Sequence, residues 1–444
     1  MTALVLGALL LSVGSRAAAA PHPLRLIIET DAGGDPDDEQ SLVRFLVYAN
    51  EFDIEGIIAN RPVARDGENQ NPIRDGLGIV RAQVKAYGEC HANLIKHDPR
   101  FPTADQLLSR TVAGYDDTDD GVRLILRAVN ADDRRPVWFS NWGTDKGSAV
   151  SCLKRALDRV LRERGPEGYA KFKSRLRLSS YDKFGEHTTS LEPPFPLWVD
   201  TFRPELDRKR WYHRFSALTA TVGGFDINRD VRTGHGPLGA LYPANTGLPQ
   251  KEGDTMAFLY LVPTGMNDPK EPGWGSWGGR YGPSEECPGK PYFWANQSDS
   301  WCGTTSRDHT LARWAADLQN DFRARMDWCV KPRAQANHRP VAVVNHRSGS
   351  EILRLEARTG GVIELNAAGS SDPDGNALAC EWFVYGEAGT YRGEISLSAT
   401  NGFATRFTAP EVKKHETVHV IMRLKDDGQP PLCSYRRVVV AIRP

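Results

Sequence analysis

The sequence predicts an α/β domain, with a mostly parallel open sheet flanked by helices, followed by a small all-β sandwich. In the first part, apolar runs with the length of buried strands alternate with segments in which apolar residues recur at helical spacing. This alternation is typical of parallel sheets whose connections are helices. Beyond about residue 340 the chain changes to short β-type runs separated by turns, which favours a sandwich of about a hundred residues.

The expected strands of the first part are apolar runs that end in polar or glycine-rich turns. They cover residues 24–28, 54–60, 136–141, 176–180 and 195–202. Helical periodicity occurs between and after them, at residues 42–49, 73–87, 119–129, 148–162 and 311–328. In such sheets the crevice at the carboxyl ends of the strands is the usual place for a ligand.

The boundary between the two parts falls in a polar, proline-containing segment. Residues 331–339 read as a linker, so the domains are expected at 21–330 and 340–444. Six β-type runs follow, at residues 341–344, 362–365, 379–384, 404–408, 418–424 and 437–442. Strands with this alternation can bury a core of their own.

Charge and leader composition limit the possible partners. Lys+Arg and Asp+Glu balance at 56 each, which gives no reason to expect nucleic acid or an anionic membrane. Residues 3–13 are mostly apolar and residues 17–20 are all alanine, which is typical of a signal peptide over residues 1–20. The apolar run is too short to span a bilayer, and no later segment is long enough. We therefore expect a secreted chain without a membrane span.

Seven cysteines are compatible with an oxidising compartment. Cys287 and Cys302 bracket a loop rich in Gly, Pro and Trp and are the expected disulfide. Cys329, Cys380 and Cys433 could pair across the domain boundary or within the second domain. The odd count leaves at least one thiol unpaired or intermolecular, and no Cys/His spacing typical of zinc occurs.

An acidic, glycine-rich turn follows the first expected strand, at residues 29–39. Asp35, Pro36 and the acids at 37–39 could simply begin the next helix, because N-caps and first turns favour these residues. Capping does not explain Asp31, which falls at the end of the strand. Carboxylates held together repel one another unless a proton or cation lies among them, and oxygen ligands select calcium or magnesium. The turn therefore predicts a metal site, with capping alone as the alternative.

The run Glu29-Thr-Asp-Ala-Gly-Gly-Asp-Pro-Asp-Asp-Glu, followed by an amphipathic helix, resembles the amino-terminal signature of the nucleoside hydrolases, Asp-Thr-Asp-x-Gly-x-Asp-Asp-Ala. Glu29 replaces the first Asp, and the turn is two residues longer. The longer form is similar to a subgroup described as cellulose-binding proteins with a nucleoside hydrolase-like domain. This resemblance implies a nucleoside hydrolase-like sheet and a metal-dependent hydrolase.

The resemblance also implies roles for particular residues. Asp31 is expected to act as the catalytic base, and Asp37 is expected to bind the sugar. The metal is expected to be calcium. Carried over by position, its ligands are Asp31, Asp38, Asp254 and the backbone carbonyl of Trp142, with Asn141 as the neighbour if the alignment slips by one residue.

Further residues have two interpretations each. Asn60, after the second strand, matches an Asn that contacts the sugar, or is a turn residue. Gly253 stands where the hydrolases keep a His that helps the departing base; His235 could substitute, or be a buried, hydrogen-bonded His. Trp274 and Trp277 lie in a glycine-rich loop and could stack on a sugar, or pin the loop by aromatic packing.

In the second domain, the turn from Asp372 to Leu378 followed by Trp382 resembles PKD-type, immunoglobulin-like modules. The sandwich is therefore expected to be Ig-like. Asp372 and Asp374 could bind calcium, but an Asp-Gly hairpin turn is the simpler explanation for both residues.

Together these expectations describe a secreted, calcium-dependent hydrolase of N-glycosidic ribosyl bonds, acting on a sugar-containing small molecule and possible as a homo-oligomer. The alternatives are a secreted cellulose- or polysaccharide-binding protein with a degenerate cleft, and an O-glycoside hydrolase. Gly253, the longer turn and Lys183, where the subgroup carries acids and amides, favour the binding protein. The retained acids, Asp31, Asp37, Asp38 and Asp254, favour the enzyme.

Overall fold

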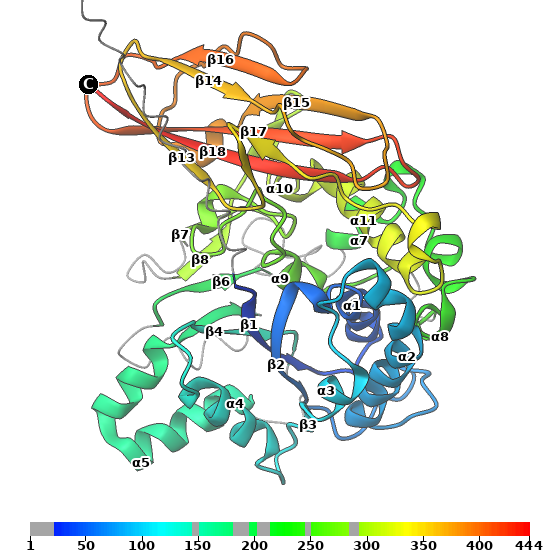
Figure 1. Ribbon diagram of the computed structural model, residues 1–444. Coiled ribbons are helices and arrows are strands. Elements are labelled where there is room, and N and C mark those ends of the chain that lie inside the picture. The colour runs from blue at the N-terminus through cyan, green and yellow to red at the C-terminus, as the bar shows by residue number, and fades with distance from the viewer. Residues whose placement is uncertain (1–21, 144–150, 181–194, 202–213, 245–249, 284–292) are drawn as a thin grey trace, which may run out of the picture.

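The computed structural model describes residues 22–143, 151–180, 195–201, 214–244, 250–283 and 293–444, and these form a helix-flanked sheet with a β-sandwich packed against it (Figure 1). The sheet has eight strands. Their order is β3 (Thr111–Ala113), β2 (Phe52–Ala59), β1 (Leu24–Thr30), β4 (Val137–Asn141), β5 (Leu176–Ser180), β6 (Trp198–Asp200), β8 (Phe293–Asn296) and β7 (Tyr281–Pro283). Neighbours from β3 to β8 run parallel, and the edge strand β7 is antiparallel. This confirms the mostly parallel sheet.

Both faces of the sheet are buried, as its continuous apolar strands require. On β1, Leu26 and Ile28 pack into one core cluster, whereas Ile27 packs into the other. The first cluster is covered by α1 (Asp37–Leu46), α2 (Gly76–His97), α9 (Thr255–Leu259) and α11 (Ala315–Trp328). The second cluster is covered by α4 (Asp120–Asn130) and α5 (Cys152–Ser174). Shorter helices complete the domain: α3 (Ala104–Leu108), α7 (Arg214–Thr219), α8 (Gly236–Ala240) and α10 (His309–Ala312).

Two helices are longer than the apolar pattern predicts. The Asp75 side chain accepts a hydrogen bond from the Gly78 amide and caps the start of α2, which continues to His97. α5 continues to Ser174 through a bend at Gly165, whose φ of 66° favours glycine. These extensions lie on the outside of the sheet and do not alter its order.

The C-terminal part is the expected sandwich, with its own core around Trp382. One sheet has the order β13 (Leu353–Arg358), β18 (Cys433–Arg443), β17 (Glu416–Asp426) and β15 (Leu378–Val384), and the other pairs β14 (Val362–Asn366) with β16 (Ala404–Thr408). A small ribbon pairs β11 (Val343–Val344) with β12 (Arg347–Ser348). β13 had no predicted counterpart, and it pairs in parallel with β18, so the sandwich is not wholly antiparallel.

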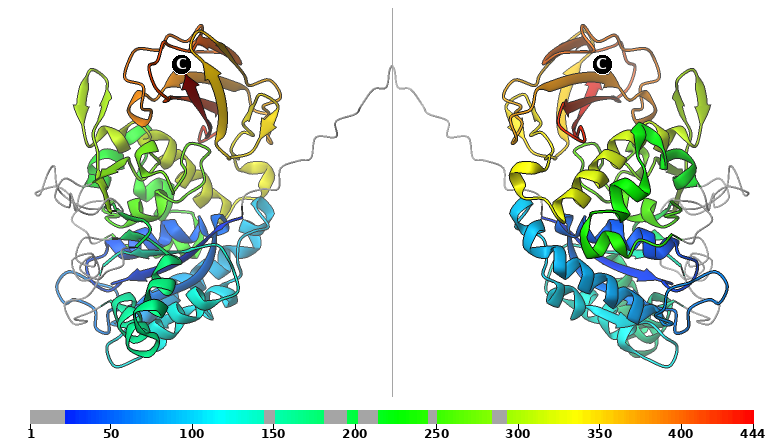
Figure 2. Two further views of the ribbon diagram at one scale, coloured as in Figure 1. Left: turned by 90° about the vertical axis from the view of Figure 1, so that its left-hand side faces the viewer. Right: turned by 90° about the vertical axis from the view of Figure 1, so that its right-hand side faces the viewer.

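The sandwich is fixed to the α/β domain through buried polar contacts, on the side of α10 and α11 (Figures 1 and 2). The amides of Tyr435 and Arg437 donate to the carbonyls of Thr264 and Gly265. Asp317 on α11 accepts from Tyr435 and from Arg423. Sandwich residues such as Tyr435 therefore belong to the main core of the α/β domain.

The cysteines do not form the expected pairs among the described residues. Cys302 is an exposed free thiol in the turn between β9 (Asp299–Trp301) and β10 (Thr304–Ser306), and Cys287 lies outside the described residues. Cys329, Cys380 and Cys433 are buried free thiols. Cys380 points into the sandwich core while Cys433 joins the core shared with the α/β domain, so the two face opposite sides of their sheet.

In the part of the chain that the structure describes, none of the helices combines the length and apolar character needed to cross a membrane.

Candidate active site

Three acidic side chains meet where β1 ends and α1 begins. Asp37 and Asp38 occupy the first turn of α1, and Asp254 directly precedes α9, which lies beside α1 (Figure 1). Each of the three offers a carboxylate oxygen, and these oxygens all lie within 4.8 Å of one another. All three side chains are buried. The two acidic motifs, far apart in the sequence, therefore form one site.

The electrostatics of this acid cluster, Asp37, Asp38 and Asp254, favour a bound cation. Burial, and then the charges of neighbouring carboxylates, raise the pKa of each of the three well above its ordinary value. In addition, Oδ2 of Asp254 is buried without a hydrogen-bond partner among the described residues. Because such a group is costly to bury, the oxygen-only donor set fits a hard cation such as calcium.

Asp31 lies next to the cluster. Its amide donates to Oδ1 of Asp38 at 3.2 Å, and its charge contributes to the raised pKa of Asp38 and Asp254. Nη2 of Arg61 lies 3.4 Å from Oδ2 of Asp31. The side chain of Asp31 is 18% exposed, so it is the most accessible of these acids. This position suits a group that meets a substrate or water.

The end of β4 forms the next wall. A Cβ on Gly143 would come within 2.4 Å of Oδ1 of Asp31, so glycine lets the backbone pass here without displacing that carboxylate. The Trp142 amide donates to the Glu29 carbonyl at 2.8 Å, and its ring is buried against Phe45 and Phe258. The Trp142–Gly143 backbone thus lies beside the acids, as a carbonyl ligand from this segment requires.

Asn60 also reaches this wall. Its Nδ2 donates to the Gly143 carbonyl at 2.7 Å, and the side chain is buried. Behind it, Glu29 accepts from the Cys152 amide at 2.8 Å and from Asn141 at 3.3 Å. Burial raises the pKa of Glu29 to about 7. Asn60 therefore braces the strand ends, and its contact with a sugar stays a prediction.

A buried network holds Asp254 in place, and sequence reasoning missed it. Arg44 on α1 pairs with Glu252, Nε to Oε2 at 2.5 Å, and both side chains are fully buried. Glu252 also accepts from Tyr242 and Thr255, and it has a φ of 45°, which is rare for a residue with a side chain. The one available signal was Arg44 itself, a charged residue within the apolar pattern of a buried helix.

His235 does not join the acids. It precedes α8, and its Nε2 lies 3.3 Å from Oδ1 of Asp327 on α11. A Cβ on the neighbouring Gly236 would contact Cys90 of α2, so the turn that carries His235 lies against α2. This placement favours the alternative interpretation, a hydrogen-bonded histidine between helices, over a substitute for the residue missing at Gly253.

The two tryptophans of the glycine-rich loop face the sandwich. Trp277 is 1% exposed, and its ring packs against Arg339 and Tyr435. Trp274 packs against His419 and Arg437. Trp277 is buried by these contacts and Trp274 is partly covered by them, which favours aromatic pinning of the loop over sugar stacking.

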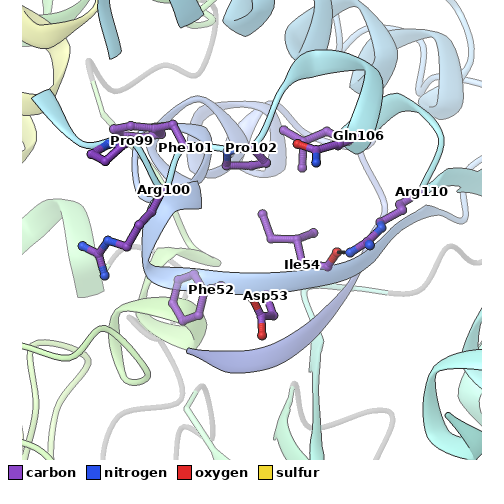
Figure 3. A pocket seen from close by; sticks show the side chains of 10 residues that line it. Phe52, Asp53, Ile54, Pro99, Arg100, Phe101, Pro102, Gln106 and Arg110 are labelled. Atoms are coloured by element: carbon purple, nitrogen blue, oxygen red, sulfur yellow. Dashed lines mark hydrogen bonds between the residues drawn. The ribbon is translucent and has the colours of Figure 1, made fainter. Parts of the chain in front are cut away.

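A separate cavity of about 330 Å³ lies at the other end of β2. Figure 3 shows Phe52 and Ile54 at the start of that strand, with Arg100 and Arg110 from the loops around α3. Arg110 donates to the Ile54 carbonyl. Since Asn60 follows the opposite end of β2, this cavity is distinct from the acid cluster.

The first strand of the parallel sheet leads into the acid cluster, and the Trp142–Gly143 end of β4 lies beside it. This combination defines a nucleoside hydrolase-like α/β domain, which is joined here to a β-sandwich. Residues 25–281 match the family described as "Cellulose-binding Sde182, nucleoside hydrolase-like domain", and the chain belongs to this family. Residues 362–442 match "Cellulose-binding protein Sde0182, C-terminal domain".

A solved structure gives the same relationship. It is that of a nucleoside hydrolase-related hypothetical protein from Saccharophagus degradans that is associated with carbohydrate metabolism. The two are 31% identical with a TM-score of 0.73, over 95% of this chain and 100% of the other. No curated protein matches the chain. The resemblance seen in the acidic turn is thereby confirmed.

Proposed function

We propose that this chain is an exported, metal-dependent glycosyl hydrolase that cleaves N-glycosidic, ribosyl bonds. The observation that carries the proposal is the buried acid cluster, in which Oδ2 of Asp254 has no hydrogen-bond partner among the described residues, with the more accessible Asp31 beside it. Calcium held by Asp38, Asp254 and their neighbours would supply a hard Lewis acid for sugar hydroxyls.

The chain's own residues have distinct tasks in this proposal. A carboxylate oxygen of Asp31 accepts the proton of the attacking water. Asp37 orients the sugar through a hydroxyl. The surrounding carboxylates stabilise the positive charge that develops on the sugar in an oxocarbenium-like transition state. The Arg61 guanidinium beside Asp31 helps to orient that side chain.

The second candidate is a secreted polysaccharide-binding protein with an inactive cleft. The family description as cellulose-binding and the absence of a histidine at Gly253 favour it. Among the described residues, the exposed aromatic side chains include Trp301 and Phe403, which are candidates for contact with a polysaccharide.

Sugar release from ribonucleosides and aryl glycosides tests the proposal. Asp31→Ala should lower turnover by at least about 10²–10⁴-fold, the usual contribution of a general base. Asp37→Ala should mainly raise KM, and Asp120→Asn, at the exposed start of α4, is the control that should change neither. Ribose release that survives in Asp31→Ala contradicts the mechanism. No release from any substrate, with binding to insoluble cellulose, favours the second candidate.

A further inference from the structure

A lysine ammonium lies inside the acid site. Nζ of Lys251 is 2.6 Å from Oδ2 of Asp35, and the two side chains are 9% and 10% exposed. Its positive charge also acts on Asp37 and Asp254, where it opposes the rise of the pKa. Asp35 belongs to the part of the turn by which this chain exceeds the nucleoside hydrolase signature. The longer turn thus brings a cation to the cluster.

The position of Lys251 is fixed from both ends. Its amide and that of Glu252 donate to the same acceptor, Oε1 of Gln40 on α1, at 2.7 and 3.2 Å. The Arg44–Glu252 ion pair then fixes the direction in which the chain continues to Asp254. A side chain held this firmly, with its charge at a site for substrate, has the preorganisation that catalysis uses.

Among the described residues, Arg61 and Lys251 form ion pairs with acids of the turn, and they differ in their partners. Arg61 pairs with Asp31, the proposed base, whereas Lys251 pairs with Asp35 and acts on Asp37 and Asp254. Hydrolysis needs a base for water and, apart from it, stabilisation of the departing group. Because Arg61 lies on the base and Lys251 acts on the acids away from it, Lys251 is the better placed of these two for the second task.

We propose that Lys251 stabilises the leaving group of the hydrolysis proposed above, in the place that Gly253 leaves without a functional side chain. The inference rests on that proposed function. As the glycosidic bond breaks, its electron pair moves to the leaving nitrogen or oxygen, and the ammonium donates a hydrogen bond to that atom. Water forms the new bond to the anomeric carbon and gives its proton to Asp31, and the released anion takes a proton from solvent.

This assignment narrows the substrate class. An ammonium is a compact charge with three rotatable donors, so it stabilises negative charge on a departing atom. It favours substrates whose leaving group departs as an anion, such as a uracil-type base or an aryl alcohol. A purine that must be protonated on its ring before departure gains less from it.

The test uses aryl β-ribosides whose phenols span a range of acidity, from nitrophenol to methoxyphenol, with calcium present. The loss of kcat in Lys251→Met should be small for the best leaving group and should grow to about 10²–10³-fold for the poorest, the size expected when one preorganised donor is removed. Lys251→Arg should recover part of the loss. Asp35→Asn, which removes the ion pair and keeps the ammonium, should change the dependence on the leaving group less than Lys251→Met does.

A structural role for Lys251 would give a different result. Lys251→Met and Asp35→Asn would then lose the same factor with every phenol, and this would overturn the inference while leaving the hydrolase intact. Calorimetric calcium binding gives an independent readout, because loss of a nearby positive charge should tighten calcium binding by Lys251→Met. Weaker calcium binding by that variant would also count against the inference. A wild-type protein that releases no phenol removes the proposed function, and the inference with it.

Discussion

Arg44 and Glu252 form an ion pair without solvent exposure, between the last turn of α1 and the segment that leads to Asp254. The guanidinium also donates to Gln319 and lies 3.7 Å from the centroid of the Phe322 ring, so α11 joins the same network. Arg44 therefore connects α1 and the segment before Asp254, which together carry the acid cluster, to α11.

Removing Arg44 should therefore be costly. Arg44→Met leaves the Glu252 carboxylate buried and unpaired, which typically costs about 3–5 kcal/mol. Urea unfolding measures the change. Arg123→Met, which removes an exposed ion pair with Asp120 on α4, is the matched control and should change the free energy of unfolding by less than about 0.5 kcal/mol. Equal losses in the two variants would show that the network does not support the fold.

Calcium should stabilise the protein through the acid cluster. At a concentration of about 100 times Kd, a bound ion adds about 2.7 kcal/mol to the free energy of unfolding. Thermal melts with calcium and with chelator should differ in the wild type and in Asp120→Asn, but coincide in Asp254→Asn. Coincident wild-type melts, without metal in elemental analysis, would remove calcium from the proposal.

Gly143 tests the close approach of β4 to Asp31. In Gly143→Ala the new methyl carbon comes within 2.4 Å of Oδ1 of Asp31, which is too close, so the carboxylate must move. We expect turnover to fall by about 10²-fold, the known effect of small misplacements at a reacting centre. Gly386→Ala, where a Cβ meets open space, is the control. Wild-type turnover in Gly143→Ala would mean that the carboxylate position is not critical.

The free energy of unfolding should fall at acidic pH because His97 and His338 form a pair between the two domains. Nδ1 of His97 on α2 lies 2.9 Å from Nε2 of His338, which also contacts Asp374 of the sandwich. Burial lowers the pKa of His97 from 6.5 to about 4, and it lowers that of His338 although Asp374 opposes the shift. The nearby charge of Arg333 also disfavours the protonated His97.

The sign follows from proton linkage. The unfolded chain binds protons at His97 more readily than the folded protein, so its contribution is complete above about pH 6.5 and is lost as pH falls toward about 4. Urea unfolding at about pH 7 and about pH 4.5 should show a smaller difference in His97→Gln than in the wild type. The exposed His415→Gln should behave as the wild type. An unchanged pH dependence in His97→Gln would assign the acid sensitivity elsewhere.

Export remains a prediction from the leader composition. Residues 1–20 should be removed, so amino-terminal sequencing of secreted protein should begin near Pro21. A soluble intracellular protein that retains Met1 would contradict it.

The sequence by itself determined the central strands of the parallel sheet, the helices that cover them and one half of the site. The apolar run at β1 and the acids after it are local patterns, because strand burial and turn chemistry depend on neighbouring residues. For the same reason the change to short β-type runs near residue 340 marked the sandwich. β13 was not predicted because its sequence, LRLEAR, alternates but contains few apolar residues.

Tertiary structure decided which distant side chains face the acids. His235 and Lys251 both precede Gly253 in the sequence, but α8 directs His235 to Asp327, whereas Gln40 holds the backbone of Lys251 against α1. A glycine-rich loop with tryptophans has the same sequence whether it binds a sugar or a second domain, and here the sandwich covers Trp277. Local sequence fixes backbone conformation and burial, but the partner of a polar or aromatic side chain depends on how remote segments pack.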